Sequence, residues 1–377
     1  MATAAQLHDQ ATEWERAGDL EAALQAYVAA SEADPLSGVL KYNAGNIQRR
    51  LKRFTDAQRS YSEALALTPN LHMARFMRAT CLLQTGDLFN GFRELEARKD
   101  CPGFDDVRYG LPRQWAGEPI ADKRLFVYPE WFQGDLMQFG RFALLAQMAG
   151  ARVILAAPPP MHAILRTMSA DIELIDAEAV PERYDFASAL MSLPAGFGTR
   201  LDTVPRGVYL HADQQRIERW RAHIGSGGLK IGIVWQGSAL AADRSVPLSA
   251  MEPLTRVPGA RLISLQKGGG LDQLPDLPQV ETLGDDFDSG PDLFVDTAAA
   301  AMSCDVVVSA DTSVAHLAGA LGVRTLVALP WLGDWRWLEG RSDTPWYPTM
   351  ALFRQATPGD WRTVFEQMAD TLADPSC

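Results

Sequence analysis

The stretch DVVVSADTSVAHLAGA, residues 305–320, shows most clearly how the chain folds. Residues 305–309 are largely apolar and β-branched, which predicts a buried strand, and a helical pattern runs from Val314 to Leu321. A strand that turns directly into a helix is half of a βαβ unit, and repeated βαβ units form a parallel sheet. Because ligands on such sheets bind in the loops after the strands, residues 311–313 are a candidate binding site.

Further strand patterns flank this stretch. The sequence predicts strands at residues 125–128, 153–156, 172–175, 230–235, 261–265 and 325–329, and helices at 138–148 and 297–302. A Gly- and Ser-rich run at residues 225–228 separates the strands into two groups. We therefore expect an α/β region with two Rossmann-like lobes, residues 101–225 and 226–355, followed by a C-terminal crossover helix at 356–377.

The first hundred residues contain an internal repeat with a step of 34 residues. The residues that recur are Ala23, Tyr27, Ala30 and Pro35, which return as Ala57, Tyr61, Ala64 and Pro69. Small residues let paired helices approach, the aromatic fills the groove between them, and proline ends the second helix. This spacing resembles the tetratricopeptide repeat, and residues 1–100 are predicted to be a helical repeat domain. Such a domain either grips a protein or caps the rest of the chain.

Composition and charge exclude several function classes. The 377 residues include 35 Lys and Arg against 47 Asp and Glu, and the formal net charge is −12. We therefore expect neither nucleic acid nor an anionic membrane as the main partner. The four cysteines are far apart without a CxxC pair, which argues against a disulfide framework and a zinc module. Without a signal segment or an apolar run of about 18 residues, we expect no membrane span and a cytoplasmic location.

An acidic run, Asp285-Asp286-Phe287-Asp288, has a spacing that is also found in metal-binding DxD motifs. It lies in a Gly- and Pro-rich stretch, which is typical of an exposed loop, and we expect no metal there. Asp296, just beyond it, is expected to cap the helix predicted at residues 297–302.

The loop after the first predicted strand brings a carboxylate to the edge of the sheet. Glu130 opens this loop, and Gly134 and Asp135 stand just before the predicted helix. Asp135 could simply cap that helix, which stabilises by about 1 kcal/mol, or it could act on a ligand.

The second lobe has three loops with polar or basic groups after predicted strands. Their residues are Gln236, Gly237, Ser238 and Arg244 in the first, Gln266 and Lys267 in the second, and Asp311, Thr312 and Ser313 in the third. The N–H groups at the start of the helix after Ser313 can bind an anion, and His316 lies one turn along. Arg244 offers a planar fork for phosphate oxygens and Lys267 a point charge. Structural alternatives exist for each of these residues. Asp311 or Thr312 could only cap the helix, His316 could be packed in the core, and Arg244 and Lys267 could be solvated surface cations.

Together these loops resemble the heptosyltransferase family of two-lobed GT-B glycosyltransferases, and in particular its tetratricopeptide-fused, flagellin or protein glycosyltransferase-like branch. The residues that carry the resemblance are Glu130 to Asp135 with Gln138-Phe139, Trp235-Gln236-Gly237, Ser264-Leu265-Gln266-Lys267, residues 311–320, Asp334-Trp335-Arg336-Trp337 and Pro345-Trp346-Tyr347-Pro348. They follow one another in the family's order along nearly the whole chain. The resemblance implies metal-independent sugar transfer from a nucleotide-sugar co-substrate, with inversion at the anomeric carbon and no cofactor.

Carried over position by position, the resemblance implies a role for each loop. Asp135 matches the family's proposed base, which deprotonates the acceptor hydroxyl, and Arg244 falls where the family places a cationic phosphate ligand. The positions that match the donor site are Gln236, Gly237, Ser238, Arg244, Gln266, Lys267, Asp311, Thr312, Ser313 and His316. Those that match the acceptor loop are Glu130, Gly134 and Gln138.

The fused repeats favour a protein acceptor, with flagellin as an analogy from the family. Two alternatives stay open. One is the same chemistry on a lipopolysaccharide or other glycan, and the other is an inactive adaptor that binds proteins through its repeats. One loop departs from the family: Trp131, Phe132 and Gln133 stand where the fused branch has a glycine-rich loop, and we expect these bulky residues to narrow the acceptor site.

Overall fold

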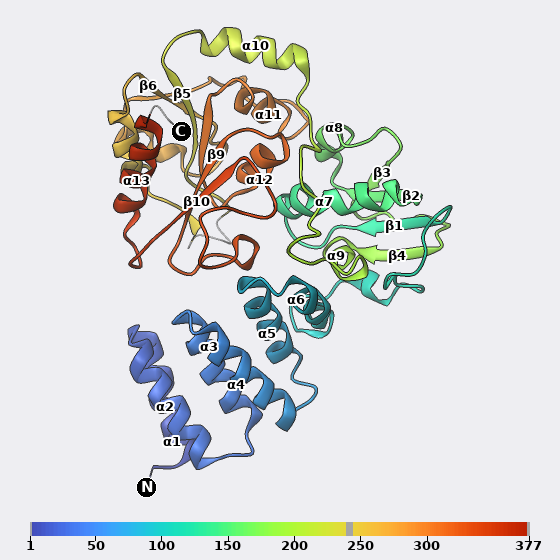
Figure 1. The fold of residues 1–377 in the computed structure, drawn as a ribbon, viewed down its shortest axis with the longest axis vertical. Coiled ribbons are helices and arrows are strands. Elements are labelled where there is room, and N and C mark those ends of the chain that lie inside the picture. The colour runs from blue at the N-terminus through green and yellow to red at the C-terminus, as the bar shows by residue number, and fades with distance from the viewer. Residues whose placement is uncertain (1, 239–243, 375–377) are drawn as a thin grey trace. The chain divides into compact units, whose positions relative to one another are not determined.

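The computed structural model describes residues 2–238 and 244–374, and the chain divides into two compact units (Figure 1). Unit 1 consists of Met1–Gly110, Phe197–Thr203 and Asp334–Glu339. Unit 2 consists of Leu111–Gly196, Val204–Gly333 and Gly340–Cys377. In the described part of the chain, no helix has both the length and the apolar composition that crossing a bilayer requires.

Unit 1 is built from paired helices, drawn in blue in Figure 1. They are α1 (Ala4–Ala17), α2 (Leu20–Ala33), α3 (Gly38–Arg50), α4 (Phe54–Leu67), α5 (His72–Gln84) and α6 (Leu88–Leu95), followed by the short turns η1 (Glu96–Asp100) and η2 (Val107–Gly110). Tyr61 is fully buried, and a Cβ atom on Gly45 would come within 2.7 Å of its ring. Small residues at the repeat positions thus let neighbouring helices touch, and the predicted tetratricopeptide-like repeats are confirmed.

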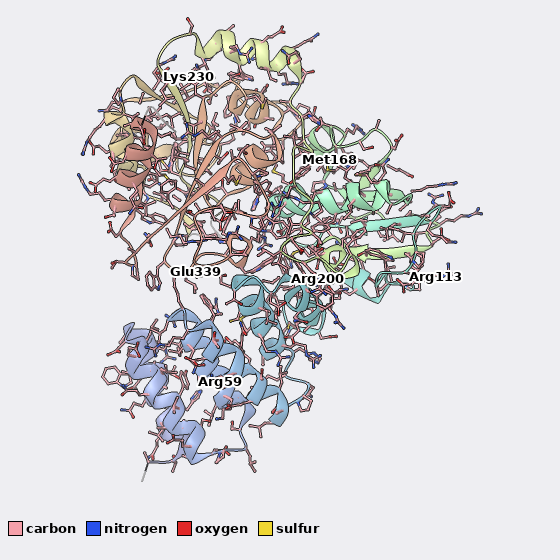
Figure 2. All side chains as sticks on the ribbon, viewed as in Figure 1. Arg59, Arg113, Met168, Arg200, Lys230 and Glu339 are labelled. Carbon is pink, nitrogen blue, oxygen red and sulfur yellow. The ribbon has the colours of Figure 1, made fainter. Side chains whose placement is uncertain are left out.

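Unit 1 extends beyond the repeats that the sequence revealed. Its later segments include Glu339, whose N–H donates to the carbonyl of Gln84 at 2.8 Å and whose carboxylate lies 3.0 Å from Nζ of Lys52 (Figure 2). The Arg200 guanidinium lies 4.1 Å from the centre of the Phe89 ring. Unit 1 therefore includes Phe197–Thr203 and Asp334–Glu339, which are distant from the repeats in the sequence.

Unit 2 contains two parallel sheets. The first has the order β3-β2-β1-β4 and is formed by β1 (Arg124–Tyr128), β2 (Arg152–Ala157), β3 (Glu173–Asp176) and β4 (Phe186–Ala189). The second has the order β10-β9-β8-β5-β6-β7 and is formed by β5 (Leu229–Val234), β6 (Ala260–Ser264), β7 (Val280–Glu281), β8 (Val306–Ala310), β9 (Thr325–Leu329) and β10 (Met350–Arg354). Every described strand pair is parallel. The second order is that of a doubly wound sheet, so the two Rossmann-like lobes are confirmed.

Helices cover these sheets. They are α7 (Gln133–Met148), α8 (His162–Leu165), α9 (Leu193–Gly196), α10 (Gln214–Ile224), α11 (Val295–Ala301), α12 (Ser313–Ala320) and α13 (Trp361–Ala373), with the 3-10 turns η3 (Pro159–Met161), η4 (Leu190–Ser192), η6 (Leu248–Arg256), η7 (Leu271–Asp276) and η8 (Trp335–Trp337). All five residues of β8 and of β9 are buried, which explains their continuous apolar sequences.

The last helix packs on the core of the second lobe. Trp361, Val364, Phe365 and Met368 of α13 belong to the same buried cluster as Ile231 of β5. Their spacing places an apolar stripe on one face of the helix, and that stripe packs on the core of the second lobe.

The cap predicted for α11 is wrong. Asp296 lies inside the first turn, and the residue before the helix is Phe294, with a φ of 67°. The Asp296 carboxylate instead accepts hydrogen bonds from Trp220 at 2.9 Å and Arg216 at 2.7 Å. Asp288 accepts from the N–H of Asp296 at 3.0 Å, so a member of the acidic run holds the helix start. Asp285 and Asp286 are exposed, as expected of a surface loop, whereas Asp288 is half-buried.

Candidate functional site

Each sheet has one point where the winding direction reverses. In the first sheet this switch point lies between β1 and β4, and in the second it lies between β5 and β8. The loops that leave neighbouring strands diverge there, which makes the carboxyl ends of those strands the usual ligand site. Asp135 lies in the first turn of α7, directly after the loop that leaves β1, and Asp311 lies in the loop after β8. Two of the loops predicted from the sequence thus lie at the switch points.

The loops after β5 and β8 lie side by side. A Cβ atom on Gly237 would stand 3.6 Å from Cγ2 of Thr312 and 4.0 Å from the carbonyl oxygen of Asp311. Nη1 of Arg244 lies 3.3 Å from Oδ2 of Asp311, and the carboxylate is almost fully buried while the Arg244 side chain is 34% exposed. The structure therefore brings Gly237, Arg244, Asp311 and Thr312 together, as the sequence predicted.

Helix α12 starts at this junction. Thr312 occupies the position before its first residue, but its hydroxyl lies 3.0 Å from Oγ of Ser309 and makes no capping hydrogen bond to the described helix. The first N–H groups of a helix without a side-chain cap can serve a bound anion. The alternative interpretation, in which Thr312 only caps the helix, does not fit this geometry.

The first turns of α7 and α12 meet. The two helices pack against each other, and a Cβ atom on Gly134 would stand 3.3 Å from Cδ2 of His316 and 3.4 Å from Oγ of Ser313. Gly134 therefore allows a close approach between the loop of the first lobe and the candidate anion site of the second. The predicted helix at 138–148 in fact begins at Gln133, so Gly134 and Asp135 lie in its first turn.

Asp135 is 5% exposed and lies in this first turn. Its Oδ2 accepts from the N–H of Phe132 at 3.3 Å, so the carboxylate does hold the start of the helix. Gly134 lies against Ser313 at the junction between α7 and α12, and Asp135 is the next residue along α7. The capping and the functional interpretations of Asp135 are thus compatible.

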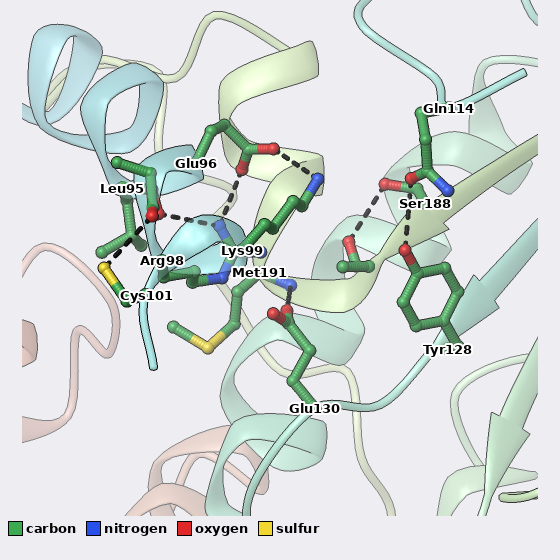
Figure 3. A network of polar contacts seen from close by, with 12 residues as sticks. Leu95, Glu96, Arg98, Lys99, Cys101, Gln114, Tyr128, Glu130, Ser188 and Met191 are labelled. Atoms are coloured by element: carbon green, nitrogen blue, oxygen red, sulfur yellow. Dashed lines mark hydrogen bonds and ion pairs between the residues drawn. The ribbon is translucent and has the colours of Figure 1, made fainter. Parts of the chain in front are cut away.

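Glu130 connects the two loops of the first switch point. Its Oε2 accepts from the N–H of Met191, in the turn after β4, at 3.0 Å (Figure 3). This bond joins the loop after β1 to the loop after β4. The geometry favours a structural role for Glu130, which fixes these two loops relative to each other.

Gln266 and Lys267 follow β6, next to the switch point. The Gln266 amide accepts from the N–H groups of Trp235 at 3.1 Å and Gln236 at 3.0 Å, and donates to the carbonyl of Gln236 at 2.8 Å. Nζ of Lys267 donates to the carbonyl of Phe287 at 2.5 Å. Gln266 therefore holds the loop after β5 in place. Among the described residues, Lys267 binds the loop at 285–288 and makes no bond to Asp311, Thr312 or Ser313.

Gln138 lies inside α7, one turn beyond Gly134, and not in a loop. The side chain is fully buried, and neither its amide oxygen nor its nitrogen has a hydrogen-bond partner among the described residues. Such a group costs about 1–3 kcal/mol, and most buried amides in native proteins do have a partner.

A buried cation that was not predicted from the sequence lies next to the site. Arg141 of α7 is 2% exposed, and its hydrogen-bond partners are all neutral. It donates to the carbonyls of Gln138 at 2.8 Å, Pro205 at 2.9 Å and Trp346 at 2.6 Å, and to the hydroxyl of Tyr209 at 2.9 Å. An arginine inside an otherwise apolar helix could have indicated this site from the sequence, because a buried guanidinium must donate its N–H groups to nearby acceptors.

No protein-family model matches the chain. The chain is similar to Protein FlbA of Caulobacter vibrioides, with 26% identity over 335 residues. That match covers 81% of this chain and 56% of FlbA, so the chain spans just over half the length of this relative.

Among solved structures, similar chains contain tetratricopeptide repeats. The TPR2B domain of yeast Sti1 in complex with a pHsp70 is 18% identical and covers 28% of this chain and 88% of its own, with a TM-score of 0.26. The Yersinia enterocolitica type III secretion chaperone SycD, in complex with a peptide of the translocator YopD, is 21% identical and covers 28% of this chain and 79% of its own, also with a TM-score of 0.26. These similarities are confined to about a quarter of the chain.

Proposed function

We propose that the chain transfers a sugar from a nucleotide-sugar donor to an acceptor hydroxyl, with a protein as the favoured acceptor. The observation that carries this proposal is the meeting of two helix starts at two switch points. The N–H groups at the start of α12 and the Arg244 guanidinium can bind the oxygens of a diphosphate. The start of α7 supplies the carboxylate of Asp135, the residue that follows Gly134, and Gly134 lies against Ser313 of α12.

The proposed reaction uses these groups as follows. Asp135 accepts the proton of the acceptor hydroxyl, whose oxygen forms a bond to the anomeric carbon of the sugar. The bond from that carbon to the diphosphate oxygen breaks, and its electron pair stays on the diphosphate. The α12 N–H groups and Arg244 stabilise the added negative charge, so the mechanism needs no metal. Asp311 holds the Arg244 guanidinium at this place, 3.3 Å away.

A protein acceptor is supported by unit 1. Its repeats already hold a segment of the chain itself, because Glu339 bonds to the backbone of Gln84 and forms an ion pair with Lys52. The Lys52 ammonium that pairs with the acidic side chain of Glu339 is a group that can also pair with an acidic side chain of another protein. The rival functions are transfer to a glycan and a purely protein-binding adaptor, and the second is favoured by one observation, the use of Asp135 to hold Phe132.

A transfer assay with an Asp135→Asn variant tests the proposal. The amide oxygen of asparagine can still accept from Phe132, so the fold should persist, but asparagine is not a base at neutral pH. We expect sugar on a co-expressed acceptor protein with wild type, as measured by intact-mass spectrometry, and none with Asp135→Asn. Equal modification by both would exclude Asp135 as the base. Modification of a glycan in place of protein would support the first rival.

A further inference from the structure

The side-chain amide of Gln138 is a buried polar group whose hydrogen bonds are not made within the described part of the chain. The side chain is fully buried, and neither Oε1 nor Nε2 has a hydrogen-bond partner among the described residues. The backbone carbonyl of the same residue, by contrast, accepts from Nε of Arg141 at 2.8 Å. An amide buried in this way destabilises the fold, and such groups in native proteins usually have a role outside the fold's own stability.

Gln138 lies on the face of α7 that meets α12. It follows Gly134 by four residues and precedes Arg141 by three, so the three residues line one face of the helix. A Cβ atom on Gly134 would stand 3.4 Å from Oγ of Ser313, in the first turn of α12. Helical side chains lean over the preceding turn, and for Gln138 this is the turn that contains Gly134, which has no side chain. The Gln138 amide therefore lies toward the start of α12.

The chemistry of an amide limits what it can bind. Oε1 accepts hydrogen bonds and Nε2 donates them, so a ligand that satisfies both atoms must donate as well as accept. The phosphate oxygens of a nucleotide-sugar only accept, and the proposed function already gives them the N–H groups of α12 and the guanidinium of Arg244. A hydroxyl group both donates and accepts, and two neighbouring hydroxyl groups on a sugar ring match the two atoms of the amide.

We propose that Gln138 binds two neighbouring hydroxyl groups of the sugar in the nucleotide-sugar: Nε2 donates to one hydroxyl, and Oε1 accepts from the other. This inference rests on the proposed function, which places the diphosphate at the start of α12, and it adds a position for the sugar beside α7. Because the amide is closed off from solvent in the structure, its side chain turns when the sugar binds. The sugar then supplies the partners that the described fold does not.

Gln138→Met tests whether the amide destabilises the free protein. Methionine is unbranched and close to glutamine in length, so it fills the same space without an amide that needs partners. We expect the Tm of the full chain without ligand to rise by about 2–4 °C. Gln147→Met is the control in the same helix, because Gln147 is only partly buried and donates to Asp171 at 3.4 Å, and its Tm should not rise. A lower Tm in Gln138→Met would overturn the inference, because it would show that the fold itself satisfies the amide.

Calorimetric titrations test the role toward the sugar. The ligands are UDP, GDP, ADP and dTDP, each compared with its hexose derivatives. For the nucleotide that wild type binds, we expect Gln138→Met to raise the Kd of the hexose derivative by about tenfold, which equals about 1.4 kcal/mol, and that of the bare diphosphate by less than about twofold. Gln147→Met should leave both Kd values unchanged.

The outcomes separate this inference from the proposed function. An unchanged Kd for the hexose derivative in Gln138→Met, or an equal rise for both ligands, would overturn the sugar-binding role and leave the diphosphate site in place. Binding of no nucleotide to wild type would overturn the proposed function, and the sugar-binding role with it.

Discussion

Gly134 and His316 face each other across the junction of two lobes: a Cβ atom on the glycine would stand 3.3 Å from Cδ2 of the histidine. The two residues are far apart in the sequence, on helices that follow different sheets. Their proximity is what turns two separate loops into one candidate site.

Gly134→Ala tests this close approach. Alanine favours a helix over glycine by about 0.5–1 kcal/mol, which offsets the crowding, so we expect thermal stability to change little. The added methyl group displaces Ser313 or His316 by a few tenths of an ångström, and we expect transfer to fall severalfold or more. Initial rates at saturating donor measure this.

Gly140→Ala is the control in the same helix. A Cβ there would meet Sδ of Met168 at 3.2 Å, which is a flexible side chain (Figure 2). We expect Gly140→Ala to transfer sugar at the wild-type rate. An equal loss of transfer rate in both variants would show that any added methyl group in α7 disturbs the protein. It would contradict a specific role for Gly134 at the junction with α12.

Arg141→Met tests the buried cation. The substitution leaves the carbonyls of Pro205 and Trp346 without their donor, and we expect the free energy of unfolding to fall by about 2–4 kcal/mol. Urea denaturation of the full chain measures it. Arg362→Met is the control, because Arg362 is 66% exposed and bonds to Glu366, and its loss should change the free energy by less than about 1 kcal/mol. A stable Arg141→Met protein would contradict the role of Arg141 as a clamp.

The free energy of unfolding of unit 1 should depend on pH through the ionisation of Glu96. Burial alone raises the pKa of the Glu96 carboxyl, but the charges of Arg98 and Lys99, at 2.8 and 2.6 Å, outweigh it and hold that pKa below its usual range (Figure 3). A carboxyl whose pKa is lowered by folding stabilises the protein above its ordinary pKa of about 4.3, and this contribution is lost as pH falls through the folded value.

We therefore expect Glu96→Gln to be about 1 kcal/mol less stable than wild type at pH 7, since the carboxylate is 33% exposed and partly screened. The difference should shrink as the pH falls below about 4. Chemical denaturation at several pH values measures it, with Glu63→Gln as a control, because Glu63 is 46% exposed in its pair with Lys41. A difference that is constant between pH 7 and pH 3 would contradict the account.

Much of the fold could be predicted from the sequence because strands and repeats carry local patterns. The predicted strand at 325–329 matches β9 (Thr325–Leu329), and the repeat at Tyr27 and Tyr61 marks two buried aromatics. The order of the strands could not be predicted, because it depends on pairing between segments such as β5 and β8 that are distant in the chain. The switch points, which locate the site, therefore became visible only in the structure.

The same limit applies to single residues. Asp311 and Arg244 were predicted as one site from residue type and loop position, and they do form an ion pair. Lys267 was placed with them on the same grounds, but its partner is the carbonyl of Phe287, which no local pattern indicates. Arg141 was missed because its partners, which include Pro205 and Trp346, are distant in the sequence and come from both lobes.

The central claim is that the start of α12, with Arg244, binds the diphosphate of a nucleotide-sugar. The most direct measurement is a thermal-shift titration with UDP, GDP, ADP, dTDP and CMP sugars, on wild type, Arg244→Gln and the control Arg256→Gln, whose arginine is 56% exposed and pairs with Glu252. A ligand at about 100 times its Kd adds about 2.7 kcal/mol of stability. We predict that one nucleotide-sugar raises the Tm of wild type and Arg256→Gln by several degrees and that of Arg244→Gln by much less. No shift for any nucleotide-sugar, or equal shifts in all three proteins, would contradict the claim.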